Sequence, residues 1–282
     1  MYIIFFLYFL SELYLLDTFN REIDTIRISI TSSCNLKCFY CAPSEESIIN
    51  SSPAVSSDKI LTFIHEAALL GIKRVKFTGG EPLLRADLYY LLSETKKIKG
   101  ITDISLTTNG VLLADMAFQL KNAGLDRINV SLDSLNSEKY RKITGFDSLQ
   151  SVIDGIHTAI SAKLVPLKIN TVLIDGVNND EIKKIKEFAS SLNVGHQTIN
   201  MMNLKENKEL SENCDTEKPP VCAQCSRIRL SADGKLLPCL FSDVVVDPEQ
   251  FETYSEAIHE CIIKKPFKGF KAIDRVMKDI GG

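Results

Sequence analysis

Ile26-Arg-Ile-Ser-Ile-Thr-Ser-Ser-Cys34-Asn-Leu-Lys-Cys38-Phe-Tyr-Cys41 is a strand-like run followed by a loop that carries three cysteines. The residues Ile26–Thr31 alternate apolar and polar side chains, which is typical of a β-strand. The cysteines follow with the spacing C-x3-C-x2-C, so all three thiols lie on one short loop. Thiolates at such short spacing favour an iron–sulfur cluster or zinc. A reactive loop directly after a strand is typical of α/β barrels.

Three thiolates leave one iron of a four-iron cluster without a protein ligand. That iron can bind another molecule, so the loop is expected to support chemistry rather than only hold the fold together. Zinc would require a fourth ligand, and the nearest downstream histidine is His65 on an expected helix. The third alternative is three free structural thiols, because cysteine often behaves as a small buried apolar residue. The tight spacing beside Lys37 and Tyr40 disfavours this alternative.

A second cysteine triplet lies nearly one domain further along the chain, at Cys222, Cys225 and Cys239. Asp233-Gly234 is a good hairpin turn that would fold the third thiol back toward the first two. A zinc ribbon that takes Cys214 as its fourth ligand is the alternative. The sequence therefore predicts a second cluster or metal site.

Two arginines lie inside this second motif, at Arg227 and Arg229. Side chains of an extended segment alternate with a period of two, so both guanidinium groups should be on one face. Planar guanidinium groups bind phosphates and nucleobases through paired hydrogen bonds. We expect an anion or nucleobase site here. Cys261 lies between apolar neighbours and is expected to be a core thiol.

Composition limits the remaining possibilities. The chain has 282 residues, is 45% hydrophobic, and carries a net charge of −3, so no overall basic field points to nucleic acid. Eight cysteines that cluster in triplets indicate a reducing, cytoplasmic compartment. Residues 1–22 begin with the apolar run Met1–Leu10, which lacks a basic n-region and is too short to span a membrane. We expect this segment to be either a helix packed on the domain or an extension without a role, and membrane association is a further alternative.

Strand-like and helix-like segments alternate from residue 23 to residue 203, which predicts an α/β protein with a parallel sheet. The expected strands are Ile26–Thr31, Arg74–Thr78, Asp103–Thr108, Arg127–Leu132, Leu167–Leu173 and Gln197–Met202. The expected helices are Lys59–Leu70, Ala86–Ile98, Leu112–Ala123, Glu138–Ile143, Leu149–Ala162 and Asp180–Leu192. A polar stretch, 203–220, then ends in two prolines and reads as a linker. Residues 204–282 form the smaller C-terminal region that carries the second triplet.

The cysteine loop together with Thr78-Gly-Gly-Glu-Pro82 after the next strand resembles the radical S-adenosylmethionine (SAM) superfamily. This resemblance implies a partial, TIM-like (β/α)6 barrel. The second triplet, its Arg-x-Arg segment and the terminal Gly281-Gly282 resemble the GTP 3′,8-cyclases of molybdenum cofactor biosynthesis. This similarity covers nearly the whole chain after residue 22. It implies two [4Fe–4S] clusters and SAM as cofactors, and GTP as substrate.

The resemblance also implies roles for individual residues. Cys34, Cys38 and Cys41 would hold the SAM cluster, and Cys222, Cys225 and Cys239 the second cluster, whose open iron meets the guanine. SAM would be surrounded by Tyr40, Gly80, Ser131 and Met202. GTP would be contacted by Arg27, Lys76, Thr107, Lys168, Arg227, Ile228 and Arg229. The Gly-Gly tail would reach toward this site.

The implied reaction begins with removal of the ribose 3′ hydrogen by a 5′-deoxyadenosyl radical, and the resulting carbon radical then attacks C8 of the purine. It requires a low-potential electron donor, and its product passes to cyclic pyranopterin monophosphate synthase. A homodimer is a further expectation. Another radical SAM enzyme, such as a peptide-modifying maturase, is the alternative. So is an inactive cluster- or zinc-binding homologue, because only Asn203–Val221 separates the sixth strand from the second triplet.

Overall fold

The computed structural model describes residues 15–41, 55–201, 222–270 and 272. Its strands form one curved sheet in the order β6-β5-β4-β3-β2-β1-β7-β8. The strands are β1 Thr25–Ser29, β2 Arg74–Thr78, β3 Asp103–Thr108, β4 Arg127–Ser131, β5 Leu167–Leu173, β6 Gly195–Asn200, β7 Arg227–Leu230 and β8 Leu236–Leu237. Neighbouring strands from β6 through β1 to β7 are parallel, and β7 and β8 are antiparallel.

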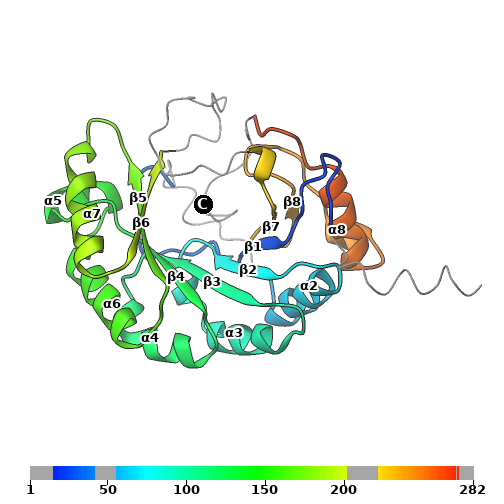
Figure 1. Cartoon of the computed structure of the whole chain (residues 1–282), viewed down its shortest axis with the longest axis horizontal. Coiled ribbons are helices and arrows are strands. Elements are labelled where there is room, and N and C mark those ends of the chain that lie inside the picture. Colours follow the sequence, from blue (N-terminus) through cyan, green and yellow to red (C-terminus); the bar gives the residue numbers. More distant parts are fainter. Residues whose placement is uncertain (1–14, 42–54, 202–221, 271, 273–282) are drawn as a thin grey trace, which may run out of the picture.

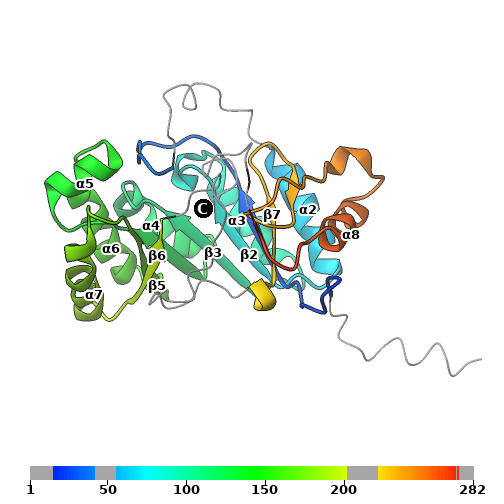
Figure 2. The same ribbon diagram turned by 90° about the horizontal axis from the view of Figure 1, so that it is seen from above.

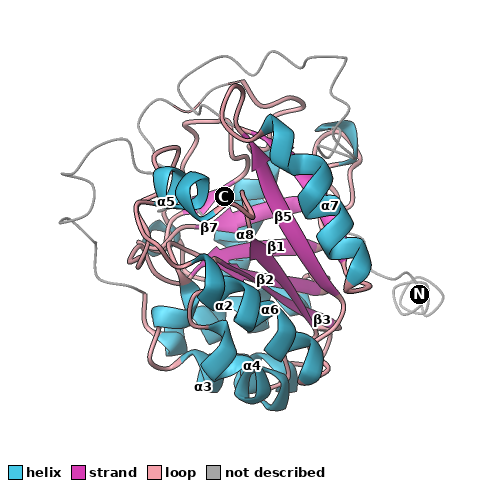
Figure 3. Cartoon of the chain, turned by 90° about the vertical axis from the view of Figure 1, so that its left-hand side faces the viewer, coloured by secondary structure: helices cyan, strands magenta, loops and turns pink. Residues whose placement is uncertain are grey.

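Helices cover the outer, convex side of the curved sheet, as Figure 1 shows for α2, α3, α4 and α6. The helices are α2 Ser57–Leu69, α3 Leu88–Lys97, α4 Leu113–Asn122, α5 Ser137–Thr144, α6 Leu149–Ser161, α7 Ile182–Ser191 and α8 Tyr254–Ile263. Short 3₁₀ turns are η2 Pro82–Leu84, η3 Asn179–Glu181, η4 Cys222–Gln224 and η5 Pro248–Gln250. Viewed from the side, the outer helices form a layer against the strands (Figure 3). The expected α/β fold with a partial (β/α)6 barrel is confirmed.

The core lies between the sheet and these helices, because alternate strand residues point outward. Ile26 and Ile28 of β1 are fully buried in this layer, whereas Arg27 between them is on the other face. Helix α2 shows the matching helical pattern, with buried residues at 60, 63, 64 and 67. It begins at Ser56, whose side chain accepts a hydrogen bond from the Lys59 N–H group, and this caps the helix.

The sheet is wider than the six strands expected from the sequence. β7 lies parallel beside β1, with Arg229 opposite Arg27, so the segment with the second triplet extends the barrel sheet itself. The hairpin expected at Asp233-Gly234 is present: Gly234 has a φ of 83°, and β8 returns along β7. Figure 2 shows β7 and helix α8 at the end of the molecule that also holds α2. Cys261 of α8 is fully buried in the core, as expected.

Within the described residues, no helix is long and apolar enough to cross a membrane. The apolar run Met1–Leu10 lies outside the described residues, so the expected packing of that segment stays a prediction. The division into segments at residues 22 and 203 also stays a prediction.

Candidate active site

Backbone hydrogen bonds anchor the first cysteine loop at its start and near its middle. Near its start, the carbonyl groups of Thr31 and Ser33 accept hydrogen bonds of 2.7 Å from the N–H groups of Gly80 and Glu81. Further along, the Lys37 N–H group donates to the carbonyl of Thr144 at the end of α5, at 2.8 Å. The loop is therefore tied to β2 on one side and to α5 on the other. This fixes the three thiols relative to the carboxyl ends of the strands.

Tyr40 provides a side-chain anchor for the same loop. Its hydroxyl donates to the Asp133 carboxylate at 2.5 Å, and the Val172 N–H group donates to the other carboxylate oxygen at 2.7 Å. Asp133 follows β4 and is buried, which raises its pKa to about 6. Because Val172 belongs to β5, this single carboxylate joins the loop to two strands.

The two glycines after β2 are required by the close approach of this loop. A Cβ added at Gly80 would lie 2.3 Å from the carbonyl oxygen of Ser33 and 2.7 Å from that of Ser32. At Gly79 an added Cβ would lie 2.4 Å from the carbonyl oxygen of Thr31. The expectation that these glycines permit a close backbone approach thus has a structural basis within the chain, independent of any ligand.

Replacing Gly80 with alanine is expected to lower the free energy of unfolding by about 1–3 kcal/mol, the typical cost of overpacking. The matched control is Gly176→Ala, where an added Cβ meets no atom within 4 Å and only the positive φ of 72° opposes a side chain. Urea unfolding of both variants under reducing conditions measures the difference. Equal losses in the two variants would show that the contact with Ser33 is unimportant.

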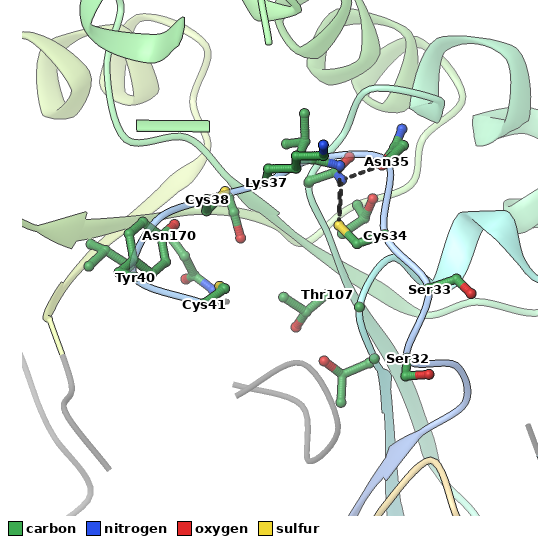
Figure 4. A pocket seen from close by; sticks show the side chains of 18 of the residues that line it. Ser32, Ser33, Cys34, Asn35, Lys37, Cys38, Tyr40, Cys41, Thr107 and Asn170 are labelled. Carbon is green, nitrogen blue, oxygen red and sulfur yellow. Dashed lines mark hydrogen bonds between the residues drawn. The ribbon is translucent and has the colours of Figure 1, made fainter. Parts of the chain in front are cut away.

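A cavity of about 480 Å³ lies beside the cysteine loop, at the carboxyl ends of the strands. All three cysteines of the first triplet border it, and Figure 4 shows them along the loop with Tyr40, Thr107 and Asn170 around the same space. Its lining residues are Ser32, Ser33, Cys34, Asn35, Leu36, Lys37, Cys38, Tyr40, Cys41, Thr78, Gly79, Gly80, Thr107, Thr108, Asn109, Ser131, Phe146, Asn170, Val172, Ile199 and Asn200. The carboxyl ends of strands β2 to β6 thus all line this cavity.

Asn109 connects the cavity wall to the first cysteine. Its Nδ2 lies 3.8 Å from Cys34 Sγ and donates to Asn35 Oδ1 at 2.7 Å (Figure 4, dashed lines). Its own backbone N–H group donates to the buried carboxylate of Glu81 at 2.6 Å. Burial raises the pKa of Glu81 to about 7, although the hydrogen bonds from Thr108, Asn109 and Leu83 oppose this shift. The Glu81 carboxylate therefore positions the residue that contacts Cys34.

The cavity wall carries polar atoms that suit a bound polar cofactor. Ser32 Oγ and Asn170 Oδ1 are buried, and neither has a hydrogen-bond partner within the part of the chain that the structure describes. Leaving such atoms unpaired is costly, so a ligand that pairs with them would be favoured. Because the three thiols line the same cavity, the donor set fits a cluster bound by three cysteines together with a polar cofactor. The sequence analysis did not identify Asn170 as a site residue. Its position offered a signal, because residues two apart on a strand share a face and Lys168 of β5 was an expected site residue.

A row of cations crosses the inner face of the sheet one layer below the cavity. Arg229 of β7, Arg27 of β1 and Lys76 of β2 are directly opposite one another in register. Thr78, two residues beyond Lys76, lines the cavity, so the row and the cavity share one face of the sheet. Among the described residues, Arg27 and Lys76 form no ion pair. By contrast, Arg74 and Arg127, at the other end of the strands, pair with Asp24 and Asp103.

The cations in this row destabilise one another. Burial and the nearby charges of Arg229 and Arg227 hold the pKa of Arg27 well below its usual range. Burial and Arg27 do the same to the pKa of Lys76, and burial lowers that of Arg229 to about 10. Arg27 Nε is also buried and has no hydrogen-bond partner among the described residues. Like charges held close together and away from water disfavour one another, so this row is suited to bind an anion with several charges.

The second triplet lies on the β7–β8 side of the sheet. Cys222 and Cys225 flank a short turn in which the Cys225 N–H group donates to the Cys222 carbonyl at 3.2 Å. Arg229 of β7 is opposite Leu237 of β8, and the nearby Cys239 and Cys225 oppose the lowering of the Arg229 pKa. Burial raises the pKa of Cys225, but Lys265 and Arg227 outweigh it and lower the value to about 7. A thiol that ionises readily is suited to bind iron.

Gly269 packs directly against this triplet. A Cβ added there would lie 2.8 Å from Cys239 Sγ and 2.9 Å from Phe241 Cβ. The segment after α8 thus closes over the third cysteine. Within the described part of the chain, no three His, Cys, Asp or Glu side chains converge closely enough to hold a single metal ion.

The structure brings most of the expected residues to one side of the sheet. Tyr40, Gly80, Ser131 and Thr107 line the cavity with the first triplet. Arg27, Lys76, Arg227 and Arg229 are on or beside the cation row, Ile228 is buried on the opposite face, and Lys168 of β5 is exposed. Ile228 can therefore contact a ligand only through its backbone. Met202, Cys214 and the terminal Gly281-Gly282 lie outside the described residues.

The cavity lining does not include the second triplet among the described residues. The expectation that both triplets face one shared space therefore stays a prediction. What the structure places together is the first triplet with the cavity, and the second triplet with the Arg227–Arg229 end of the cation row. The β1–β7 pairing connects these two halves.

Comparison with known families and proteins adds to this geometry. The family model of the radical SAM superfamily matches residues 28–189. The chain is 39% identical to the GTP 3′,8-cyclase of Thermodesulfovibrio yellowstonii, over 88% of this chain and 92% of that protein. It is 32% identical to the GTP 3′,8-cyclase of Clostridium acetobutylicum, over 95% of this chain and all of that protein. A probable GTP 3′,8-cyclase of Methanosarcina mazei is 38% identical, over 86% and 87%.

Solved structures resemble the fold at lower identity. The anSMEcpe enzyme with bound S-adenosylmethionine has a TM-score of 0.65 at 15% identity, covering 86% of this chain and 80% of its own. SuiB of Streptococcus suis bound to S-adenosylmethionine has a TM-score of 0.64 at 15% identity, covering 83% and 66%. The fold and the cysteine loop are thus those of a radical SAM enzyme. Within that superfamily, the chain belongs to the GTP 3′,8-cyclase family.

Proposed function

We propose that this protein converts GTP to (8S)-3′,8-cyclo-7,8-dihydroguanosine 5′-triphosphate, the first step of molybdenum cofactor biosynthesis. The observation that carries the proposal is the row of cations Arg229, Arg27 and Lys76, one layer below the cavity that the first triplet borders. Arg229 is buried, and Arg27 and Lys76 are half-buried. A triphosphate carries about four negative charges, and a unit charge pair at ~4 Å contributes roughly 4 kcal/mol at an effective dielectric constant of 20. Binding it would therefore compensate the cations.

In this proposal Cys34, Cys38 and Cys41 hold a [4Fe–4S] cluster in the cavity, and Cys222, Cys225 and Cys239 hold a second one. When bound, the first cluster and SAM would supply a 5′-deoxyadenosyl radical that removes the ribose 3′ hydrogen. After the carbon radical attacks C8, uptake of one electron and one proton would complete the cyclised product. Tyr40, Gly80, Ser131 and Met202 surround SAM. GTP is bound by Arg27, Lys76, Thr107, Lys168, Arg227, Arg229 and the backbone of Ile228.

The chain's own residues bind and orient the reactants. The cation row would hold the triphosphate against β1, β2 and β7, which directs the nucleoside toward the strand ends. Thr107 lies two residues from Ser105, which is opposite Lys76, so its hydroxyl is one layer closer to the cavity. The ribose would then lie between the phosphate site and the cysteine loop. In this position its 3′ hydrogen could reach the 5′-deoxyadenosyl radical that the cluster and SAM would supply.

The proposal extends to partners. We expect a low-potential electron donor for the first cluster and transfer of the product to cyclic pyranopterin monophosphate synthase. The protein is expected to work in the cytoplasm, as a homodimer, and without nucleic acid. The exposed aromatic side chains Phe19 and Phe267 contact each other edge to face, with ring centroids 5.3 Å apart, and Arg21 lies over the Phe19 ring.

The test is turnover by the anaerobically reconstituted protein with SAM and with GTP deuterated at the ribose 3′ carbon. The expected result is transfer of deuterium to 5′-deoxyadenosine and formation of the cyclised triphosphate. ATP and ITP serve as comparisons, since neither has the full guanine edge. If all three nucleotides left SAM cleavage and products unchanged, the assignment of GTP would be wrong. Zinc with little iron in the purified protein would instead indicate an inactive homologue.

A further inference from the structure

Two buried cations from opposite ends of the chain hold the backbone beside the second cysteine triplet. Arg21 donates to the carbonyl oxygen of Cys222 at 2.7 Å. Lys265, just after α8, donates from its Nζ to the carbonyl oxygen of Arg227 at 2.6 Å and to that of Pro238 at 2.7 Å. Each of the three cysteine segments is therefore tied to a cation, because Arg227 follows Cys225 by two residues and Pro238 precedes Cys239.

The two cations differ in how their charge is balanced. Arg21 forms a buried ion pair with Asp17, with Nε 2.5 Å from the carboxylate, so that unit is close to neutral. Lys265 is only 3% exposed, and in the part of the chain that the structure describes no carboxylate lies within ion-pairing distance of it. Carbonyl groups supply partial negative charge but do not neutralise a buried ammonium group. An uncompensated buried charge of this kind costs free energy unless an anion is bound nearby.

A cluster held by three thiolates is such an anion, and its one-electron reduction makes it more negative. We infer that Lys265 is the counterion and backbone clamp of the second cluster, and that it favours the reduced form of that cluster. The inference rests on the proposed function, since it requires Cys222, Cys225 and Cys239 to bind a cluster. It adds a positioning residue that acts on the electrostatics of the site without touching GTP. The lowered pKa of the Cys225 thiol, to which Lys265 contributes, agrees with this arrangement.

Three substitutions separate the charge of Lys265 from its hydrogen bonds. Lys265→Arg keeps the charge, Lys265→Gln keeps a donor for the carbonyls but loses the charge, and Lys265→Met loses both. The matched control is Lys264→Gln, which removes one charge from the exposed neighbouring lysine, paired with Glu260. The measurements are iron per chain and the potential of each cluster, followed by electron paramagnetic resonance. Addition of SAM identifies the signal of the first cluster, which also reports that each variant is folded.

The expected result for Lys265→Gln is full iron content and a second cluster that is harder to reduce. At a fixed potential its reduced-to-oxidised ratio should fall about tenfold, which corresponds to 59 mV for a one-electron couple. Lys265→Met should also lose the iron of the second cluster, whereas Lys265→Arg and Lys264→Gln should match the wild-type potential. A wild-type potential in Lys265→Gln would overturn the inference. So would an equal shift in Lys265→Arg and Lys265→Gln.

Iron counting on the wild-type protein distinguishes failure of this inference from failure of the proposed function. About eight irons per chain, with an unshifted potential in Lys265→Gln, would overturn only the role of Lys265. About four irons, unchanged by Cys225→Ala, would show that the second triplet binds no cluster. That outcome would contradict the proposed function and the inference together.

Discussion

Arg27→Met is expected to lower the rate of GTP turnover by about 100-fold and at the same time to make the apo-protein more stable. The loss of activity follows because Arg27 would hold the triphosphate and so position the ribose, and a misplacement of about 1 Å can cost about 10²-fold in rate. The gain in stability follows because Arg27 Nε is buried without a partner and the guanidinium lies among other cations. Removing an unpaired buried donor should recover about 1–3 kcal/mol. Methionine retains most of the aliphatic volume.

The contrast is Arg74→Met on the neighbouring strand. Arg74 is opposite Thr25 in register and pairs with Asp24 at 2.5 Å, so its removal leaves a carboxylate without its partner. We expect this variant to be slightly less stable and to change KM for GTP by less than about twofold, since exposed pairs contribute little. Urea unfolding of both apo-proteins and steady-state kinetics of the reconstituted enzymes give the comparison. Loss of stability in Arg27→Met would mean that the arginine is already compensated within the fold.

The sequence was sufficient to predict the elements of the barrel and the face on which Arg27 lies. Alternating strands such as Ile26–Ser29 and helical apolar periods such as that of α2 are local patterns, and local patterns can be read from one chain. Arg27 was identified because its isoleucine neighbours had to face the helices. The observed strand β1 begins at Thr25, one residue earlier than predicted, and ends at Ser29, two residues earlier. Shifts of this size are typical of element boundaries.

The pairing of β7 with β1 could not be predicted, because it joins segments about 200 residues apart and no local pattern records it. For the same reason, the residues that support the site could not be identified from the sequence. Asp133 holds Tyr40, Asn109 contacts Cys34, and Lys265 holds the second triplet, and each acts through a contact between distant segments. Each of them is an ordinary polar residue in the sequence. Their roles depend on burial and on the partners that the fold brings to them.

Removing one cysteine from each triplet should have different effects on SAM cleavage and on product formation. Cys38→Ala and Cys225→Ala are each expected to reduce the iron content from about eight to about four per chain, since each cluster holds four irons. Cys38→Ala should abolish reductive cleavage of SAM, because its thiol belongs to the cavity beside β1. Cys225→Ala should retain SAM cleavage but form no cyclised nucleotide, because its thiol lies by Arg227 and outside that cavity lining.

Cys261→Ala is the control for loss of a thiol. Cys261 is fully buried in α8 among apolar residues, so this variant should keep its iron and its activity while losing about 1 kcal/mol of stability from the small cavity. The measurements are anaerobic iron analysis, 5′-deoxyadenosine formation and product formation for all three variants. Cyclised product from Cys225→Ala at the wild-type rate would show that the second triplet is not part of the site. Iron loss in Cys261→Ala comparable to that in Cys225→Ala would show that iron content follows fold stability rather than ligation. In that case the assignment of both triplets would have to depend on spectroscopy of each cluster.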